Sequence, residues 1–253
     1  MKCFESVAEW REFRANMEPS RASLGFVPTM GALHAGHTSL LTQSKSDNAY
    51  TALSIFVNPT QFNEAKDLKN YPVTLAQDLD LARAAGVDFV LLPKYAELYP
   101  DQYRYQIKEI ETSQILCGAH RPGHFEGMLS VVMKLLNLVR AKRAYFGEKD
   151  FQQLQLVRGM VEAFFIETEI IACPTVREAD GLAMSSRNLR LTPNERAQAT
   201  LLPKILFENL SLAESRQRLA DAGFRVEYVE NWGGRKLAAV HLGQVRLIDN
   251  VKT

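Results

Sequence analysis

The chain has little of several features that mark particular classes of protein. Its 253 residues include three cysteines, Cys3, Cys117 and Cys173, which lie far apart and form no C-x-x-C pair. Such an odd and scattered set argues against a disulfide framework and against a zinc knuckle, so we expect a reducing, cytoplasmic compartment. No segment contains about 18 consecutive apolar residues, and Glu5 and Glu9 interrupt the amino-terminal stretch, so we expect neither a membrane span nor a signal peptide.

An excess of charge of one sign is also missing. The chain has 30 Lys and Arg residues against 29 Asp and Glu residues, which gives a formal net charge of +1. Proteins that bind nucleic acid or anionic lipid usually present a basic surface, so we expect neither partner. The length and the 46% hydrophobic content fit a globular protein of one large domain or two modest ones.

Two common phosphate-binding loops are absent from the sequence. Neither G-x-x-x-x-G-K-[ST] nor G-x-G-x-x-G occurs. If the protein binds a nucleotide, another arrangement of donors must therefore hold its phosphates.

What the sequence does contain is an alternation of short apolar runs with amphipathic segments. The runs are rich in β-branched residues and apolar on both faces, which is typical of buried parallel strands. Between them, apolar residues recur at helical spacing, and Thr74, Gln77 and Gly86 predict a capping box and an end for one of these helices. This alternation predicts an α/β fold, a Rossmann-like doubly wound parallel sheet with helices on both faces. The predicted strands are 24–29, 50–58, 87–93, 143–147 and 168–174, and the predicted helices include 74–86, 129–139 and 149–164.

The pattern changes near residue 175. Thr192, Pro193 and Glu195 predict a capped helix start, and the apolar spacing carries that helix through Ile205. Residues 224–231 and 235–251 then predict strands, with a turn at Gly243 and Gln244 inside the second range. We therefore expect a first domain over residues 1–175 and a smaller C-terminal α+β domain over residues 176–253.

The stretch FVPTMGALHAGHTSL, residues 26–40, places His34 and His37 where a predicted strand passes into a helix. The N–H groups and the dipole at a helix N-terminus attract phosphate, and Gly31 and Gly36 would let the backbone approach it. Imidazole N–H groups also donate to oxygens whose negative charge grows during phosphoryl or nucleotidyl transfer. Two other interpretations stay open from these residues alone: surface or helix-capping residues, and a metal pair, which the missing third ligand disfavours.

Five stretches together carry a resemblance to a known family. HAGH after a first strand is similar to the nucleotidylyltransferase superfamily, and AMSSRN (183–188) resembles its second, mobile phosphate-binding motif. SIFVNPTQF (54–62), RPGHFEGM (121–128), FGEKDFQQL (146–154) and PTVREADGLAMSSRN (174–188) narrow the resemblance to the pantothenate synthetase family. The resemblance extends over nearly the whole chain. It implies a homodimeric enzyme that joins pantoate to β-alanine with ATP through a pantoyl adenylate, releasing AMP and pyrophosphate.

The resemblance also implies an ATP site built from both domains. Catalysis is assigned to four donors that stabilise charge on the leaving pyrophosphate: His34, His37, Lys149 and Arg187. Asp150 is expected to hold the ribose hydroxyls. The complete set of implied ATP contacts is Pro28, Thr29, Met30, His34, His37, Gly147, Lys149, Asp150, Val176, Met184, Ser185, Ser186 and Arg187, the last three closing over the triphosphate from the second domain.

Pantoate binding is assigned by the same resemblance to Gln61 and Gln153, because neutral amides bond to both hydroxyls and carboxylates. Further pantoate contacts are expected around its gem-dimethyl group and at the rim of the site. His124 is expected at the edge of the site, whereas His120 is expected to be structural or exposed. Two valines of this set fit an ordinary helix core equally well. The further implied contacts are Met30, Asn58, Phe62, Arg121, Val131 and Val132.

Magnesium is implied by ATP, and Asp78 is the expected carboxylate ligand, although an acid in the first turn of a helix is explained equally well by the helix dipole. The chain departs from the family pattern in two places. Glu126 stands where members often have arginine, and the region after Asn188 is expected to be shorter than usual.

Two other functions fit part of the pattern. A different nucleotidyl transferase would keep HAGH but has no reason to carry NPTQF together with GEKDFQQL. A non-catalytic ATP-binding regulator would lose phosphate-contacting donors, and all four are present. A tRNA synthetase is disfavoured by the missing anticodon-binding mass and basic face.

Overall fold

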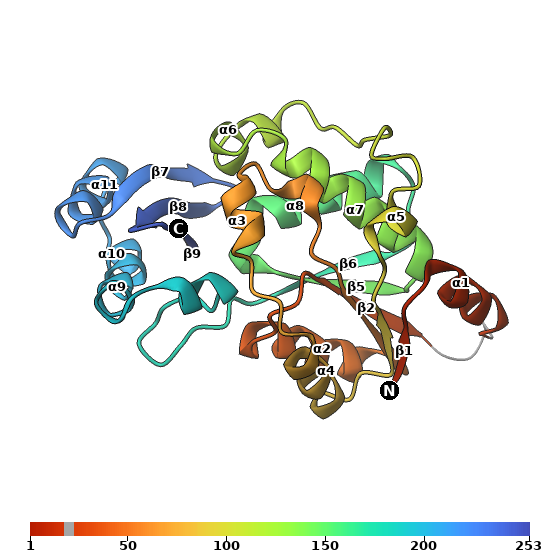
Figure 1. Ribbon diagram of the computed structural model, residues 1–253. Coiled ribbons are helices and arrows are strands. Elements are labelled where there is room, and N and C mark those ends of the chain that lie inside the picture. Colours follow the sequence, from red (N-terminus) through yellow and green to blue (C-terminus); the bar gives the residue numbers. More distant parts are fainter. Residues whose placement is uncertain (18–22) are drawn as a thin grey trace. The chain divides into compact units, whose positions relative to one another are not determined.

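The computed structural model describes residues 1–17 and 23–253, and the chain forms two compact units (Figure 1). The first unit comprises Met1–Gly147 and Gln152–Cys173, and the second comprises Glu148–Phe151 and Pro174–Thr253. The first is an α/β unit and the second an α+β unit, which confirms the predicted fold class. The short segment 148–151 belongs to the second unit, although the sequence-based division placed it in the first.

In the described part of the first unit, six parallel strands form one sheet, in the order β1-β4-β3-β2-β5-β6. The chain adds β3 and β4 on one side of β2 and then crosses to place β5 and β6 on the other side. This reversal creates a topological switch point between β2 and β5, and open α/β sheets bind ligands at the carboxyl ends of the strands there. The strands are β1 (Lys2–Phe4), β2 (Leu24–Thr29), β3 (Tyr50–Ile55), β4 (Phe89–Leu91), β5 (Arg143–Gly147) and β6 (Glu169–Cys173).

Helices cover both faces of this sheet, as predicted (Figure 1). On one face, α2 (Ala35–Asp47) and α4 (Leu75–Ala84) bury Leu41 and Ala82 in one cluster with Val27 and Leu53 of the strands. On the other face lie α7 (His124–Val139) and α8 (Phe151–Ala163), with α1 (Val7–Asn16) packed on α7. Shorter elements are η1 (Pro59–Gln61), α3 (Ala65–Lys69), α5 (Tyr95–Leu98), η2 (Thr112–Gln114), α6 (Cys117–His120) and η3 (Glu148–Asp150).

The helix predicted at 74–86 is present, but its expected capping box is wrong. The Thr74 hydroxyl makes no cap hydrogen bond and instead donates to Asp78 Oδ1 at 3.1 Å. The predicted end is confirmed, since Gly86 follows the helix with a φ of +76°. Tertiary structure redirected the Thr74 side chain because Asp78 is itself fixed by a loop far away in sequence.

The second unit contains a three-stranded antiparallel sheet, β7-β8-β9, and a cluster of buried apolar residues that includes Leu202, Leu219, Val240 and Leu247. The predicted turn between two strands at Gly243 and Gln244 joins β8 to β9. The elements are η4 (Ser186–Arg190), α9 (Pro193–Ala199), α10 (Leu201–Phe207), α11 (Leu212–Asp221), β7 (Arg225–Trp232), β8 (Arg235–Leu242) and β9 (Val245–Lys252).

The capping box of Thr192 and Glu195 is confirmed, but the continuous helix through Ile205 is wrong. The chain instead forms two helices, α9 and α10, separated at Thr200. Pro203 explains the break, because its ring clashes with the carbonyl four residues earlier, at Ala199, in an uninterrupted α-helix.

Candidate active site

The loop that leads to His34 and His37 follows strand β2, which lies at the switch point of the first unit. Strand β2 ends at Thr29, and helix α2 starts at Ala35 after a five-residue loop, 30–34. The neighbouring strand β5 ends at Gly147, two residues before Lys149 in the chain. The sheet therefore delivers the histidine pair to the edge where α/β folds bind their ligands.

A buried carboxylate holds the loop between β2 and α2. Asp78 is 1% exposed, and its Oδ2 accepts a hydrogen bond from Ala32 N at 3.0 Å while Oδ1 accepts one from Leu33 N at 2.7 Å. Gly31 and Ala32 have φ values of +82° and +49°, a backbone conformation that turns successive N–H groups toward one anion. The amides of Ala32 and Leu33 therefore bind Asp78, whereas the approach of phosphate to the backbone at Gly31 stays a prediction.

The same contacts bear on the magnesium role predicted for Asp78. Both of its oxygens accept hydrogen bonds from the loop or from Thr74. Within the described residues, no group of three or more His, Cys, Asp and Glu side chains is arranged to hold a metal ion. The geometry explains Asp78 as the support of the loop and gives the metal role no support.

His34 and His37 cap helix α2 reciprocally. Nδ1 of His34 accepts a hydrogen bond from Gly36 N at 3.1 Å, and Nδ1 of His37 accepts one from His34 N at 3.3 Å. The two rings lie 4.1 Å apart between centroids, at an interplanar angle of 36°. In a neutral imidazole, a nitrogen that accepts carries no proton, so the proton of each ring lies on Nε2. The helix-capping interpretation is confirmed, and the caps fix both tautomers.

These caps determine which donors the helix start contributes. The amides of Gly36, His37 and Thr38 all donate to atoms of His34. The first-turn backbone is thus largely satisfied, and the donors that the motif supplies are the two Nε2–H groups. They lie at the positive end of the helix dipole, which favours an anionic ligand.

Asn58 is a buried hydrogen-bonding centre next to Gln61. It is 1% exposed, and its Nδ2 donates to Gly127 O at 3.1 Å and to Gln61 Oε1 at 3.0 Å. Its Oδ1 accepts from the Thr60 and Tyr99 hydroxyls, both at 3.0 Å. Both N–H groups and the oxygen of the Asn58 side chain therefore have partners within the protein. The structure shows Asn58 as a support of Gln61, whereas the sequence predicted a contact with pantoate.

The orientation of the Gln61 amide follows from this network. Gly127 O only accepts, so the Asn58 atom facing it must be the NH₂ group. The Gln61 atom that faces the same NH₂ group must then be its oxygen. Gln61 therefore directs its own NH₂ donors away from Asn58.

Tyr99 keeps its proton for this network. Burial raises the pKa of Tyr99 to about 12, against weaker lowering effects of its bonds to Thr60 and Asn58. The hydroxyl is a hydrogen-bond donor to Asn58 throughout the physiological pH range. Nothing in the sequence around Tyr99 predicted this role.

The start of helix α7 supports the same segment and explains much of the RPGHFEGM motif. His124 Nδ1 lies 2.8 Å from Gln61 O, and Arg121 Nη1 lies 2.9 Å from His124 Nε2. A Cβ on Gly127 would lie 2.2 Å from Thr60 O, so only glycine permits this approach. His124, expected at the edge of the site, thus holds the backbone of Gln61.

The other predicted pantoate residues occupy varied positions in the first unit. Val131 and Val132 are buried in α7, and Phe62 packs edge-on against Tyr71 at 5.5 Å between ring centroids. Gln153 is half-buried in α8, whereas its neighbour Gln152 is buried and bonds to Cys117 N, Thr112 O and Ile115 O. Met30 is half-buried, and the Thr29 hydroxyl donates to Ser54 O at 2.8 Å.

The predicted phosphate contacts of the second unit lie on two segments. Lys149 and Asp150 belong to η3, where Lys149 Nζ lies 4.0 Å from Asp150 Oδ2. Ser185 caps η4 by accepting from Arg187 N at 3.2 Å, and Met184 N donates to Val176 O at 3.0 Å. Sequence reasoning missed the residues that hold these segments: Arg177, Arg235, Asp249 and Asn250.

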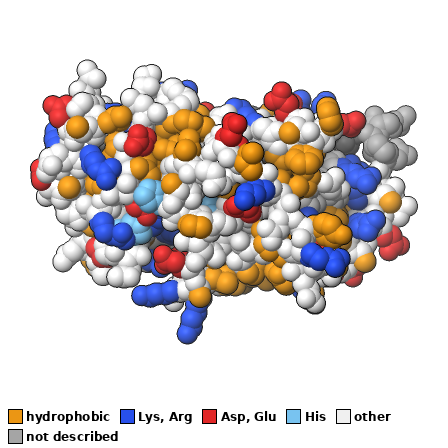
Figure 2. All heavy atoms as spheres, turned by 90° about the horizontal axis from the view of Figure 1, so that it is seen from above, with side chains coloured by type: hydrophobic (Ala, Val, Ile, Leu, Met, Phe, Trp, Pro, Cys, Tyr) orange, Lys and Arg blue, Asp and Glu red, His pale blue; other side chains and the backbone are white. Residues whose placement is uncertain are grey.

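On the face drawn in Figure 2, basic side chains are interspersed with acidic and apolar ones, and no extended basic surface crosses it. None of the helices formed by residues 1–17 and 23–253 is both long and apolar enough to cross a membrane.

Comparison with known proteins decides the family. The sequence matches the model described as pantoate-beta-alanine ligase over residues 2–252. The chain belongs to the pantoate-beta-alanine ligase family. Membership makes it an enzyme, a ligase that condenses pantoate with β-alanine, and confirms the resemblance drawn from the motifs.

Relatives match along nearly their full length. The pantothenate synthetase of Bdellovibrio bacteriovorus is 56% identical over 241 residues, which are 95% of this chain and 96% of that protein. The pantothenate synthetase of Legionella pneumophila is 53% identical over 250 residues, 99% of each chain. These two relatives match this chain over 96% and 99% of their own length, and the expectation of a region after Asn188 shorter than usual in the family stays a prediction.

Solved structures agree with the fold. The pantoate-beta-alanine ligase of Francisella tularensis, crystallised with beta-gamma ATP and β-alanine, superposes with a TM-score of 0.95 at 40% identity, covering 100% of this chain and 97% of that one. The pantothenate synthetase of Thermus thermophilus gives a TM-score of 0.90 at 38% identity, covering 100% of this chain and 99% of that one.

Proposed function

We propose that this ligase uses ATP to activate pantoate as a pantoyl adenylate, which β-alanine then converts to pantothenate. An amine cannot displace oxide from a free carboxylate, so the acid must first acquire a better leaving group. The observation that carries the proposal is the reciprocal cap of His34 and His37, in which each Nδ1 accepts a hydrogen bond and Nε2 is the protonated nitrogen of each ring at the switch point. The Francisella relative crystallised with beta-gamma ATP and β-alanine supports the same pair of ligands.

In the first half-reaction, a carboxylate oxygen of pantoate attacks the α-phosphorus of ATP, and the bond from that phosphorus to the bridging oxygen breaks. Pyrophosphate leaves with the bonding electrons. Donation from His34 and His37 to the phosphate oxygens stabilises the charge that develops on the leaving group. Lys149 and Arg187 complete the catalytic set proposed from the family motifs, and no protein nucleophile is needed.

The other ATP contacts follow the motifs. Pro28, Thr29 and Met30 line the nucleoside, Asp150 binds the ribose hydroxyls, and Ser185 and Ser186 bind the triphosphate. Both oxygens of Asp78 accept hydrogen bonds from the loop between β2 and α2. Magnesium would therefore enter as part of the MgATP substrate, with phosphate oxygens and waters as most of its ligands. The remaining proposed ATP contacts are Gly147, Val176 and Met184.

Pantoate is recognised by Gln61 and Gln153. The Gln61 amide has a fixed orientation, so its NH₂ group donates to an oxygen of the hydroxy acid. A site that holds such a donor ready rejects an analogue without the hydroxyl by about 10⁴-fold, because the donor would be left unpaired. The proposed apolar and rim contacts are Met30, Phe62, Arg121, Val131 and Val132.

In the second half-reaction, the β-alanine nitrogen attacks the acyl carbon of the adenylate. The carbon–oxygen bond to the phosphate breaks, AMP leaves with the electron pair, and the nitrogen loses its extra proton.

We also infer a cytoplasmic homodimer, from the family resemblance and the three scattered cysteines. Sedimentation of the purified protein at micromolar concentration tests the dimer.

Isotope exchange tests the route. Enzyme, magnesium, ATP and pantoate without β-alanine are expected to exchange labelled pyrophosphate into ATP, and addition of β-alanine is expected to release AMP with pantothenate. A His37→Ala variant serves as the control for adventitious exchange. Lack of pantoate-dependent exchange in the wild-type protein, or ADP as the nucleotide product, contradicts the adenylate route.

A further inference from the structure

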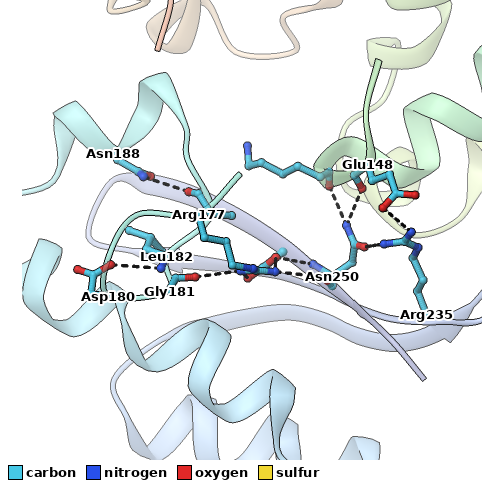
Figure 3. Close-up of polar contacts among 11 residues, drawn as sticks. Glu148, Arg177, Asp180, Gly181, Leu182, Asn188, Arg235 and Asn250 are labelled. Carbon is cyan, nitrogen blue, oxygen red and sulfur yellow. Dashed lines mark hydrogen bonds and ion pairs between the residues drawn. The ribbon is translucent and has the colours of Figure 1, made fainter. Parts of the chain in front are cut away.

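Two consecutive residues of β9 contact two different segments of the second unit (Figure 3). Asp249 and Asn250 are both buried, with 2% and 3% of their surface exposed. Consecutive side chains of a strand point to opposite faces of the sheet. The two residues therefore reach chain segments on opposite sides of β9.

Asn250 holds the segment that carries Lys149. Its Nδ2 donates to Glu148 O at 2.9 Å and to Lys149 O at 3.0 Å, while its Oδ1 accepts from Arg235 Nη1 at 2.7 Å. Because carbonyls only accept and a guanidinium only donates, this amide has a single possible orientation. Arg235 returns to the same segment through an ion pair of 2.8 Å with Glu148 and lies 4.6 Å from the centre of the Phe151 ring.

Asp249 holds the segment that leads to Ser185, Ser186 and Arg187. Its carboxylate forms a two-point ion pair with Arg177, at 2.7 Å from Nη1 and 2.9 Å from Nη2. Paired, planar contacts of this kind fix orientation as well as distance. Arg177 also donates to Gly181 O at 3.0 Å, so it secures the turn that precedes the serines.

Further hydrogen bonds join the two ends of the segment from Arg177 to Asn188. Arg177 and Ala183 form a β-bridge, and Glu178 N donates to Leu182 O at 2.8 Å. Beyond Arg187, Asn188 Nδ2 donates to Glu178 Oε1 at 2.8 Å. The serines and Arg187 thus lie on a closed loop whose base is the ion pair to Asp249.

We propose that Asp249 and Asn250 are positioning residues of the ligase reaction, which fix the separation of the two segments expected to bind the ATP phosphates. Asn250 fixes the backbone of Lys149, and Asp249 fixes the Ser185–Arg187 loop through Arg177. Since the two residues are adjacent on one strand, neither segment shifts without the other. This inference rests on the proposed function.

The inference is tested by substituting Asn250 and measuring ATP use. Displacing a catalytic group by about 1 Å typically costs about 10²-fold in rate. Asn250→Ala is therefore expected to lower kcat of pantoate-dependent pyrophosphate exchange by about 10- to 100-fold and to raise the KM for ATP. The KM for pantoate is expected to stay unchanged, because the proposed pantoate residues lie in the first unit. Asn231→Ala, an exposed position on β7 of the same sheet, is the matched control.

A double-substitution cycle separates positioning from general weakening of the fold. Calorimetry with a non-hydrolysable ATP analogue gives Kd for wild type, Asn250→Ala, Lys149→Ala and the pair. If Asn250 acts through Lys149, the pair is expected to bind within about twofold of Lys149→Ala alone, whereas independent effects multiply. Equal fold-losses in both backgrounds, or equal changes in the KM of both substrates, overturn the inference.

Folding is checked by circular dichroism, with assays well below the lowest melting midpoint. Asn250→Asp, which keeps the acceptor for Arg235, serves if Asn250→Ala does not fold. If neither variant folds, the residue is structural only and the inference is wrong. A wild-type protein without exchange would refute the proposed function itself, whereas exchange that is insensitive to Asn250 refutes only this inference.

Discussion

Nδ2 of Asn58 donates a hydrogen bond of 3.0 Å to Oε1 of Gln61, and this bond determines that the NH₂ end of the Gln61 amide faces away from Asn58. Asn58 is itself oriented by Gly127 O and by two hydroxyls. A residue that the sequence placed in contact with substrate is in this structure the support of its neighbour.

Gln61→Ala and Gln153→Ala are expected to raise the KM for pantoate far more than the KM for ATP. Each lost bond to a neutral partner is worth about 0.5 to 1.5 kcal/mol, and a stranded buried group adds to that. Steady-state kinetics with each substrate varied in turn gives both constants. Gln155→Ala, at a half-buried position two residues further along α8, is the control, and equal losses for both substrates would place the two amides outside the pantoate site.

Tyr99→Phe is expected to raise the KM for pantoate by a few fold. The change removes one donor to Asn58 and keeps the buried ring, so the loss is about 1 kcal/mol. Because burial raises the pKa of Tyr99 to about 12, the ratio of mutant to wild-type KM should not vary between pH 6 and 9. Tyr105→Phe, at a side chain that is 70% exposed, is the control. A ratio that changes across this pH range would refute the donor role.

His34→Asn and His34→Ala separate the cap from the donor. Asparagine is a good N-cap residue, so His34→Asn is expected to keep most of the stability that His34→Ala loses, about 1 kcal/mol. Both variants lack Nε2–H and are expected to lose about 10²- to 10³-fold in the rate of adenylation, and His37→Ala likewise. Thermal melts and pyrophosphate exchange measure the two effects. Near wild-type exchange in a folded His34→Asn protein would remove His34 from the catalytic set.

Asp78→Asn is expected to destabilise the protein without changing its requirement for magnesium. The amide cannot accept at both ends, so one of the two loop N–H groups loses its partner, at a cost of about 1 to 3 kcal/mol. Urea unfolding measures the stability, and Asp80→Asn, at a side chain that is 78% exposed, is the matched control. A rise in the magnesium concentration needed for half-maximal activity would instead restore the metal role predicted from the sequence.

Glu227 is expected to make the second unit sensitive to acid. Burial raises the pKa of Glu227, but hydrogen bonds and charges from Arg246 and His241 outweigh burial and leave it below its ordinary 4.5. A depressed carboxyl pKa stabilises the fold above the unfolded value, and this contribution is lost as pH falls through the folded value. Glu227→Gln should therefore lower the melting midpoint at pH 7, and the difference should shrink below pH 4.5. Glu230→Gln, exposed on the same strand, is the control, and a difference that is equal at both pH values would argue against the ionised role.

The alternation of strands and helices, and the place of His34 and His37 at a helix start, could be predicted from the sequence. Both depend on short-range patterns: apolar periodicity, and a polar pair just after a strand. The motifs also identified the family, because five separate stretches matched along the chain. Patterns of this range fail where distant residues compete, as at Thr74, whose hydroxyl turns to Asp78, or where a proline interrupts a helix, as at Pro203.

The roles of several polar residues depend on contacts between distant parts of the chain. Asp78 bonds to Leu33 across 45 residues of sequence, Asn58 to Gly127 across 69, and Asn250 to Lys149 across 101. No local pattern marks such partners, because a buried donor or acceptor takes whichever complementary group the folded chain brings within reach, and leaving it unpaired costs free energy. The sequence motifs predicted which residue types belong to the site. Which of these residues face a ligand, and which hold the others in place, depends on the path of the folded chain.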